Sequence, residues 1–428
     1  MIKRILVCVL LVCLVSSSAM AQSNSNPIIV NLGSLGSILN VLNVLGGHLL
    51  DHIPGTNIYL LNLPYIPVLT PLLQLVTNIL WMEPDRHITA PHRGKWGIVS
   101  VGSKTAADFY KNQPGLLLTR ANLAETYSTG RGIVVADLNS QVDYAHPGLA
   151  GHLTSGNDFV AARSGYQATL NQSDASFLDQ SSSAFLDSYQ SSSAFLDQSS
   201  SAFLDQSAAT FLNQSDASFL DAGNPAHGHG TLCAGIIAAV APNSMVMPLR
   251  VFDDNGNADV FSIVKAIYWG VDHGARVINM SFGLSSSYNS IQAALAYAAS
   301  HNVQVVASAG NNNTSTPQFP ASASGVMGVA ATDLNDVKAS FSNYGSTIYV
   351  DAPGVNVVSA YPGGYYAVVS GTSFSAPIVA AETALVMSVK TSSAKTIVGN
   401  ATVNINGKNP LYYGKLGRGR VDLLNAVK

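Results

Sequence analysis

The feature that most constrains the fold is a regular alternation of apolar strands and helical stretches between residues 245 and 307. Short runs rich in Val, Ile and Met recur here, and the segments between them carry apolar residues at the spacing of a helix face. The predicted strands are Met245–Leu249, Ala275–Asn279 and Val303–Ala307, and the predicted helices are Val260–Gly270 and Ile291–Ala299. This alternation predicts an α/β fold, a parallel sheet flanked by helices with its functional site at the carboxyl ends of the strands.

Three short motifs contain the residue types of a nucleophilic site. Ser373 follows a Gly-Thr turn and precedes an apolar run, so its hydroxyl is expected near the amino end of a helix. Free backbone N–H groups and the helix dipole at such an end favour a developing oxyanion. His229 stands between two glycines, and Asn311 follows a predicted strand. Taken singly, the three residues would be read as a helix cap, a structural histidine and a turn residue.

Together these motifs resemble those of the subtilisin-like serine proteases, the subtilases. The matching segments, in the family's order along the chain, are His229–Gly235, Ala307–Asn311 and Gly371–Pro377, and the resemblance covers roughly residues 116 to 428. It implies a three-layer subtilisin-like fold in which Ser373 attacks the scissile carbonyl and His229 takes its proton. It also implies that Asn311 stabilises the oxyanion, together with the backbone N–H of Ser373.

The resemblance further implies where a polypeptide substrate binds. An extended peptide would pair with the backbone of Ser281, Phe282 and Gly283. Ala309 and Gly310 would line the first specificity pocket. Small residues at these positions permit a large apolar substrate side chain, but the far wall of the pocket cannot be identified from the sequence.

The third catalytic residue departs from the family pattern. The family places an Asp at the end of an apolar strand, and an alignment on Val142–Asp143 and His146–Pro147 without a gap puts Asn139 there. Asp137 lies two residues earlier, on the same side of the strand. Either a bulge or a two-residue shift brings Asp137 to His229, or Asn139 orients the imidazole, or the site is inactive. The intact Ser373, His229 and Asn311 argue against an inactive site, and we take Asp137 as the first choice and Asn139 as the alternative third member.

The N-terminal part of the chain indicates a secreted precursor. Residues 1–21 have a short basic start, an apolar run and an Ala-x-Ala ending, as in a Sec signal peptide that is cleaved after Ala21. Residues 22–86 resemble the small α/β inhibitor-type propeptide of subtilases. Residues 87–115 are the predicted linker with the maturation cut, and residues 116–428 are the predicted catalytic domain. The protein is therefore expected outside the cell or on its surface, without a membrane span in the mature form.

An insert at residues 164–222 repeats a Phe-Leu pair followed by Asp or Asn. Its phenylalanines recur at steps of eight with one step of ten. Such repeats could stack as small ordered units or form a flexible Ser-rich loop, and the sequence leaves both open.

Composition excludes several partners and cofactors. Only 11% of residues are charged and the net charge is −3, so neither nucleic acid nor an acidic membrane surface is implied. Cys8 and Cys13 belong to the predicted signal peptide, which leaves Cys233 alone and predicts no intramolecular disulfide. No cofactor is required by the expected chemistry. The His-Gly-His spacing does not form a zinc ligand set, and calcium is an option for which the sequence places no ligands.

The sequence thus predicts a secreted serine endopeptidase whose partners are polypeptide substrates and its own propeptide. The alternative is a catalytically impaired, secreted protein of subtilase fold that serves as a binding or scaffold protein. The two hypotheses differ in one property, the reactivity of Ser373.

Overall fold

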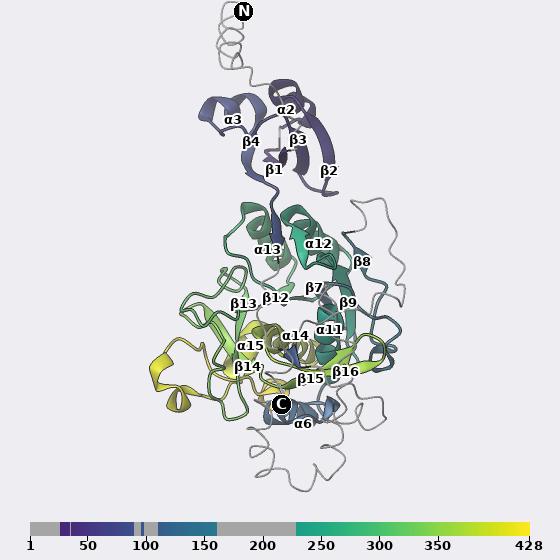
Figure 1. Cartoon of the computed structure of the whole chain (residues 1–428), viewed down its shortest axis with the longest axis vertical. Coiled ribbons are helices and arrows are strands. Elements are labelled where there is room, and N and C mark those ends of the chain that lie inside the picture. The colour runs from purple at the N-terminus through teal and green to yellow at the C-terminus, as the bar shows by residue number, and fades with distance from the viewer. Residues whose placement is uncertain (1–25, 35, 90–95, 98–109, 161–227) are drawn as a thin grey trace, which may run out of the picture. The chain divides into compact units, whose positions relative to one another are not determined.

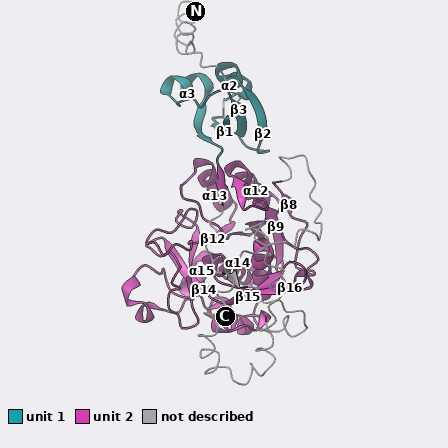
Figure 2. Cartoon of the chain, in the orientation of Figure 1, with its two compact units in different colours: residues 1–86 teal, residues 87–428 magenta. Residues whose placement is uncertain are grey.

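The structure is a computed structural model of the chain and describes residues 26–34, 36–89, 96–97, 110–160 and 228–428 (Figure 1). The predicted signal peptide and repeat insert lie outside these residues, as does much of the predicted linker. The chain forms two compact units, Met1–Arg86 and His87–Lys428 (Figure 2). Each unit is described by itself.

The first unit is a small α/β structure. Its antiparallel sheet has the strand order β2-β3-β1-β4. The elements are β1 (Asn26–Leu32), α2 (Ile38–Leu45), β2 (His48–His52), β3 (Ile58–Leu63), α3 (Pro71–Thr77) and β4 (Ile79–Pro84). Helix α3 begins with a proline and is capped by Thr70, whose side chain accepts a hydrogen bond from Leu73 N. That this unit is a propeptide stays a prediction.

The second unit is built on a seven-stranded sheet of order β14-β13-β12-β11-β7-β9-β8 in which all strand pairs are parallel. Its strands are β7 (Val134–Asn139), β8 (Asn157–Asp158), β9 (Met245–Arg250), β11 (Val277–Met280), β12 (Gln304–Ser308), β13 (Met327–Thr332) and β14 (Ile348–Pro353). Strands β11 and β13 are buried along their whole length and β7 at all but its first residue, as expected for a sheet covered on both faces. The predicted parallel sheet is confirmed.

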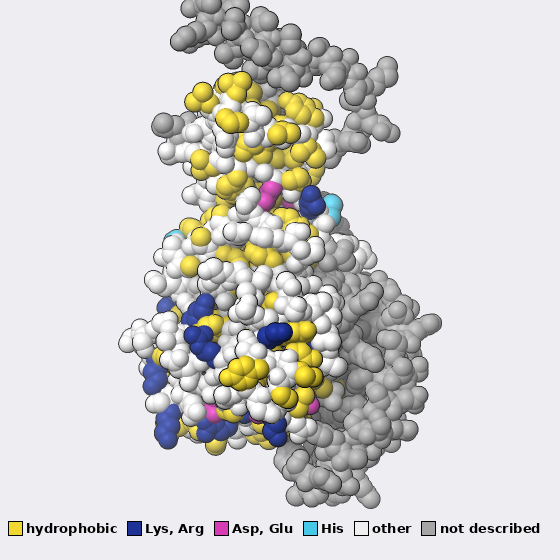
Figure 3. Space-filling view, turned by 90° about the vertical axis from the view of Figure 1, so that its left-hand side faces the viewer, with side chains coloured by type: hydrophobic (Ala, Val, Ile, Leu, Met, Phe, Trp, Pro, Cys, Tyr) yellow, Lys and Arg dark blue, Asp and Glu magenta, His cyan; other side chains and the backbone are white. Residues whose placement is uncertain are grey.

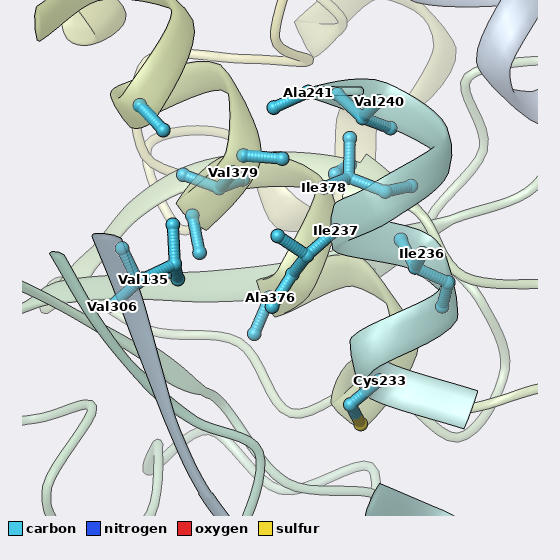
Figure 4. Close-up of a cluster of buried hydrophobic side chains, with 14 of the residues drawn as sticks. Val135, Cys233, Ile236, Ile237, Val240, Ala241, Val306, Ala376, Ile378 and Val379 are labelled. Atoms are coloured by element: carbon cyan, nitrogen blue, oxygen red, sulfur yellow. The ribbon is translucent and has the colours of Figure 1, made fainter. Parts of the chain in front are cut away.

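Four helices form the outer layers. They are α11 (His229–Val240), α12 (Val260–Asp272), α13 (Asn289–Ser300) and α14 (Thr372–Val389). Figure 1 shows α12 and α13 on one side of the strands and α11 and α14 on the other. Helix α14 is the one helix of the described residues that is long and apolar enough to cross a membrane, but it is mostly buried in the core. There it packs against α11 and the sheet through side chains such as Val379, Ile237 and Val306 (Figure 4).

Smaller elements complete this unit. Two short sheets have the orders β15-β16-β6 and β10-β5. The remaining elements are β5 (His87–Thr89), β6 (Trp96–Gly97), α5 (Pro114–Leu118), α6 (Ala121–Ala124), η1 (Pro147–Leu149), β10 (Asn257–Asp259), β15 (Val357–Tyr361), β16 (Tyr365–Val369), α15 (Ala394–Asn400), η3 (Asn406–Lys408), η4 (Pro410–Tyr412) and α16 (Leu423–Val427). The described parts of the predicted linker, residues 87–115, therefore belong to the second unit, not to a free connection.

Candidate active site

His229 is the first residue of α11, and the glycines beside it allow a close backbone approach. A Cβ on Gly230 would lie 2.5 Å from the carbonyl oxygen of Ser140, which follows β7. Gly228 has a φ of +77°, in the left-handed region that favours glycine. These two glycines let the first turn of α11 lie directly against the end of β7, and so bring the imidazole to that strand.

The side chain of Asn139, at the end of β7, contacts Nδ1 of the imidazole. Its Oδ1 lies 2.7 Å from His229 Nδ1 and also accepts a hydrogen bond of 2.9 Å from Ser140 N. Its Nδ2 donates to Asp137, at 3.2 Å from Oδ2 and 3.4 Å from Oδ1. Both ends of the amide are thus fixed, and the oxygen faces the imidazole. Nδ1 then carries the proton as donor, which leaves Nε2 as the basic nitrogen.

Asp137 lies behind Asn139 and is completely buried. The register of β7 with β9 runs from Val134 to Asn139 without a shift, so the bulge that would carry Asp137 to the imidazole is absent. The carboxylate accepts a second hydrogen bond of 2.7 Å from Asn279 Nδ2. Burial raises the pKa of Asp137 to about 7, and the hydrogen bonds from Asn279 and Asn139 oppose this rise.

Ser373 is the second residue of α14, where backbone N–H groups have no acceptor within the helix. Its Oγ donates to the carbonyl oxygen of Ser281 at 3.1 Å, and Ser281 Oγ donates to the carbonyl oxygen of Ser373 at 2.8 Å. Asn279 Nδ2 donates to Ser281 Oγ at 2.9 Å. Hydrogen bonds therefore connect Asp137, through Asn279 and Ser281, to the backbone of the candidate nucleophile.

Cys233 lies between the two candidate catalytic residues. Its Sγ is 3.5 Å from the carbonyl oxygen of Ser373 and 3.9 Å from His229 Nδ1. The ring of His229 also lies 5.6 Å from that of Phe374, the residue after the serine. Burial raises the pKa of the Cys233 thiol well above its ordinary value, which favours the protonated thiol over the nucleophilic thiolate.

Asn311 is held by the residue that precedes the serine. Its Oδ1 accepts hydrogen bonds from Thr372 N and Thr372 Oγ1, each at 2.9 Å. Thr372 Oγ1 in turn accepts from Gly310 N at 3.1 Å. Because both bonds occupy Oδ1, the amide is oriented with Nδ2 as its remaining donor, beside the amino end of α14.

The predicted substrate-binding residues form two neighbouring segments. Ser281, Phe282 and Gly283 follow β11, and Ala309 and Gly310 follow β12, its neighbour in the sheet. The neighbouring parallel strands β11 and β12 therefore set the positions of both segments.

A residue that sequence reasoning missed, Gln318, crosses from one segment to the other. Its N–H donates to the carbonyl oxygen of Ala309 at 2.9 Å, and Leu284 N donates to the carbonyl oxygen of Phe319 at 2.6 Å. The backbone of Gln318 and Phe319 therefore connects the segment after β11 with the segment after β12. No local pattern identifies Gln318, since it stands in a turn-rich segment.

Asn279 and Thr372 were missed as well. A polar residue inside the apolar strand Val277–Met280 was a signal that could have identified Asn279, because a buried amide needs partners. Within the described ranges, no group of three or more His, Cys, Asp or Glu side chains could hold a metal ion. A calcium site stays a prediction without ligands.

Comparison with known proteins identifies the family of the chain. The Subtilase family matches residues 130–406. Thermitase of Thermoactinomyces vulgaris is 38% identical over 214 residues, which are 47% of this chain and 75% of thermitase. The thermostable alkaline protease of Halalkalibacterium halodurans is 41% identical over 171 residues, which are 38% of this chain and 47% of that protein. The alignment thus spans less than half of the second relative.

A solved structure shares the fold. The crystal structure of fervidolysin from Fervidobacterium pennivorans, a keratinolytic enzyme related to subtilisin, superposes with a TM-score of 0.65 at 22% identity. The match covers 96% of this chain and 62% of that one. From the family match, the identity to thermitase and this fold, the chain belongs to the subtilase family of serine endopeptidases.

Proposed function

We propose that this chain is a secreted serine endopeptidase that uses Ser373 as nucleophile, His229 as general base and Asn311 as oxyanion donor. The observation that carries the proposal is the hydrogen bond of 2.7 Å between His229 Nδ1 and the oxygen of Asn139. It leaves Nε2 of the imidazole able to accept the hydroxyl proton.

The reaction follows the usual course of acyl transfer. Ser373 Oγ attacks the scissile carbonyl carbon as its proton passes to His229 Nε2, and the carbonyl oxygen becomes an oxyanion. Asn311 Nδ2 and the N–H of Ser373 donate to that oxygen. The C–N bond then breaks, the leaving amine takes the proton from the imidazolium, and an acyl-enzyme remains. Water repeats the sequence, attacking the ester and giving its proton to His229, and releases the acid and Ser373.

Asn139 can serve in place of the usual carboxylate because its amide is held in one orientation. In serine proteases a change of this Asp to Asn lowers turnover by about 10⁴-fold, because the imidazole is then held as the wrong tautomer. Here Asp137 and Ser140 N keep the amide oxygen toward the imidazole. Asp137 is therefore a positioning residue. The side chain of Asn139 separates its carboxylate from the imidazolium that forms.

The precursor organisation is also part of this proposal. Residues 1–21 have the pattern of a signal peptide, which supports export to the extracellular space or cell surface. Residues 22–86 are proposed as an inhibitory propeptide with the catalytic domain as partner. Support comes from the many large apolar side chains that the first unit exposes, which favour a docking role (Figure 3). They include Leu39, Leu49, Leu50, Ile66, Val68, Leu72, Leu75 and Leu80.

The test is the reactivity of Ser373. The secreted wild type should lose its N-terminal segment, as measured by intact mass, and should be labelled covalently by a fluorophosphonate probe, whereas Ser373→Ala should do neither. Ser375→Ala is the matched control, because the Ser375 hydroxyl is buried against the carbonyl oxygen of Ala352 and should not be needed for labelling. An unlabelled, uncut wild type would support the binding or scaffold protein instead.

A further inference from the structure

The C-terminal part of the second unit carries a charge opposite to that of the whole chain. Residues 338–428 contain eight Lys or Arg and three Asp or Glu, although the net charge of the chain is −3. The three acids are Asp351, Glu382 and Asp422, and all of them are buried. The side-chain charges that this part leaves in contact with solvent are therefore all positive.

Three of these cations are held on tyrosine rings at neighbouring positions. Lys415 Nζ lies 5.7 Å from the ring centre of Tyr344, and Arg418 Cζ lies 4.5 Å from that of Tyr349. Lys395 Nζ lies 5.0 Å from the same ring of Tyr349. The chain around Lys415 and Arg418 pairs with the chain that leads into β14, and Arg418 N donates to the carbonyl oxygen of Tyr349 at 3.0 Å. Cation–π contacts therefore hold the three cations on one stretch of the surface.

Two large apolar side chains project beside these cations. Leu411 and Tyr413 are 85% and 74% exposed, more than the other large hydrophobic side chains described in the second unit. They lie in and directly after η4, and the exposed Lys408 and Lys415 flank them in the chain. These four residues form a basic apolar tip, in the yellow loop at the left edge of Figure 1. Figure 3 views this side and shows Lys and Arg next to hydrophobic side chains over the second unit, with few acids.

The residues between those of the tip hold it on the second unit. The ring of Tyr412 lies 4.8 Å from that of Tyr344, in an edge-to-face arrangement. Asn409 Nδ2 donates to the carbonyl oxygens of Asp336 and Ile405, at 2.8 and 2.9 Å. These contacts support the backbone of the tip, while Leu411 and Tyr413 stay in solvent.

The acids of the neighbouring turn do not neutralise the tip. Asp336 is paired with Arg420, whose Nε lies 2.6 Å from Asp336 Oδ1. Asp333 Oδ1 accepts hydrogen bonds from the backbone N–H groups of Asn335 and Val337, each at 2.9 Å. Both carboxylates are thus engaged close to the turn, and the lysines of the tip remain available to an anionic partner.

We propose that the basic apolar tip docks the protein on a membrane surface that contains anionic lipids. Exposed Leu and Tyr side chains favour the boundary between headgroups and acyl chains, and the flanking lysines attract anionic headgroups. A soluble polyanion would match the lysines, but it offers no apolar phase to Leu411. Charge complementarity and the exposed apolar pair therefore favour a lipid surface.

Docking at the tip leaves the candidate active site free. The tip packs beside the chain that leads into β14, at the amino ends of the parallel strands. Ser281 and Asn311 follow strands β11 and β12, so the active site lies at the carboxyl ends. The two sites are at opposite edges of one sheet, and a docked enzyme can still receive a polypeptide.

The test is sedimentation with lipid vesicles, using the full chain with Ser373→Ala to prevent self-digestion. Vesicles of phosphatidylcholine with phosphatidylglycerol should bind the protein at least about 10-fold more tightly than phosphatidylcholine alone, because the lysines contact anionic headgroups. Leu411→Ser/Tyr413→Ser should weaken this binding by about 10-fold or more, the effect of losing two apolar side chains. Lys408→Gln and Lys415→Gln should each weaken it by about 5-fold at low salt.

Matched controls are Leu123→Ser and Lys111→Gln, which change an exposed leucine and an exposed lysine outside the tip and should leave vesicle binding unchanged. All variants should keep the melting temperature of the parent, since their side chains are exposed. A protein that does not bind anionic vesicles contradicts the proposal, as does binding that the tip variants do not weaken. Tighter binding to heparin, unchanged by Leu411→Ser/Tyr413→Ser, would contradict it too and assign this surface to an anionic polysaccharide.

Discussion

At the residue scale, the candidate site depends on amide side chains with a fixed orientation. Asn139 is held between Ser140 N and Asp137, and Asn311 is held by two hydrogen bonds from Thr372. An amide has a donor end and an acceptor end, so its catalytic value depends on which end faces the reacting group. In Asn139 and Asn311 the neighbouring groups fix the orientation of the amide, and this orientation is the one that the proposed reaction needs.

Asn311→Ala should therefore lower kcat by about 10²- to 10³-fold with little change in KM, as expected for an oxyanion donor that acts mainly in the transition state. Thr372→Val removes one of the two bonds that orient Asn311 and keeps the backbone one, so its loss should be smaller. Steady-state kinetics on one peptide substrate measures both. An Asn311→Ala enzyme within about twofold of the wild type would show that another group binds the oxyanion.

At the scale of the element, helix α14 contains a buried carboxylic acid whose ionised form its surroundings do not stabilise. Glu382 is completely buried, and both of its carboxyl oxygens lack a hydrogen-bond partner among the described residues. Burial, and then the nearby Asp422, raise the pKa of Glu382 well above its ordinary value of 4.5. An acid whose pKa is raised by folding destabilises the folded state as pH rises above the ordinary value, by about 1.4 kcal/mol for each unit of the shift.

Glu382→Gln should thus raise the melting temperature at pH 8 more than at pH 4, where the carboxyl is neutral in the folded chain and mostly neutral in the unfolded chain. The comparison is best made in a Ser373→Ala background, which prevents self-digestion. An equal difference at the two pH values would mean that the carboxyl is not desolvated as described.

The sequence predicts such elements better than it predicts their contacts. The apolar spacing of Val260–Gly270 predicts a helix, and the structure has one at Val260–Asp272. Such a prediction succeeds because periodicity is a local property of the sequence. The partner of His229 is not local. The gapless alignment on Val142–Asp143 and His146–Pro147 pointed to Asn139, but the sequence could not exclude a bulge that brings Asp137 to the imidazole, because the register of β7 with β9 is set by tertiary pairing.

At the scale of the whole second unit, the topology brings the site together. Asn139 ends β7, Ser281 follows β11 and Asn311 follows β12, and these three strands are neighbours in the order β12-β11-β7. Because they are parallel, their carboxyl ends lie at one edge of the sheet, where parallel α/β folds place their ligands. The motifs were sufficient to predict this edge and the candidates Ser373, His229 and Asn311. Gln318 was not predictable, since only the folded chain brings it between Gly283 and Gly310.

The most direct test exchanges the two β7 residues Asp137 and Asn139. Asp137→Asn should lower kcat by about 10²-fold or more with little change in KM, since the amide of Asn139 loses the group that orients it. Asn139→Asp alone places two carboxylates side by side and raises the pKa of one of them. The double variant Asp137→Asn/Asn139→Asp puts a single carboxylate directly on the imidazole and should recover the activity.

The dependence of kcat on pH distinguishes positioning from a structural role. Since the pKa of Asp137 is raised to about 7, its ionised form is present above that pH, and wild-type activity should fall as the pH drops through about 7. The part of this fall that Asp137 causes should be missing in Asp137→Asn. We predict a low kcat for Asp137→Asn and recovery in the double variant. A fully active Asp137→Asn enzyme, or a double variant no better than the single one, would contradict the account.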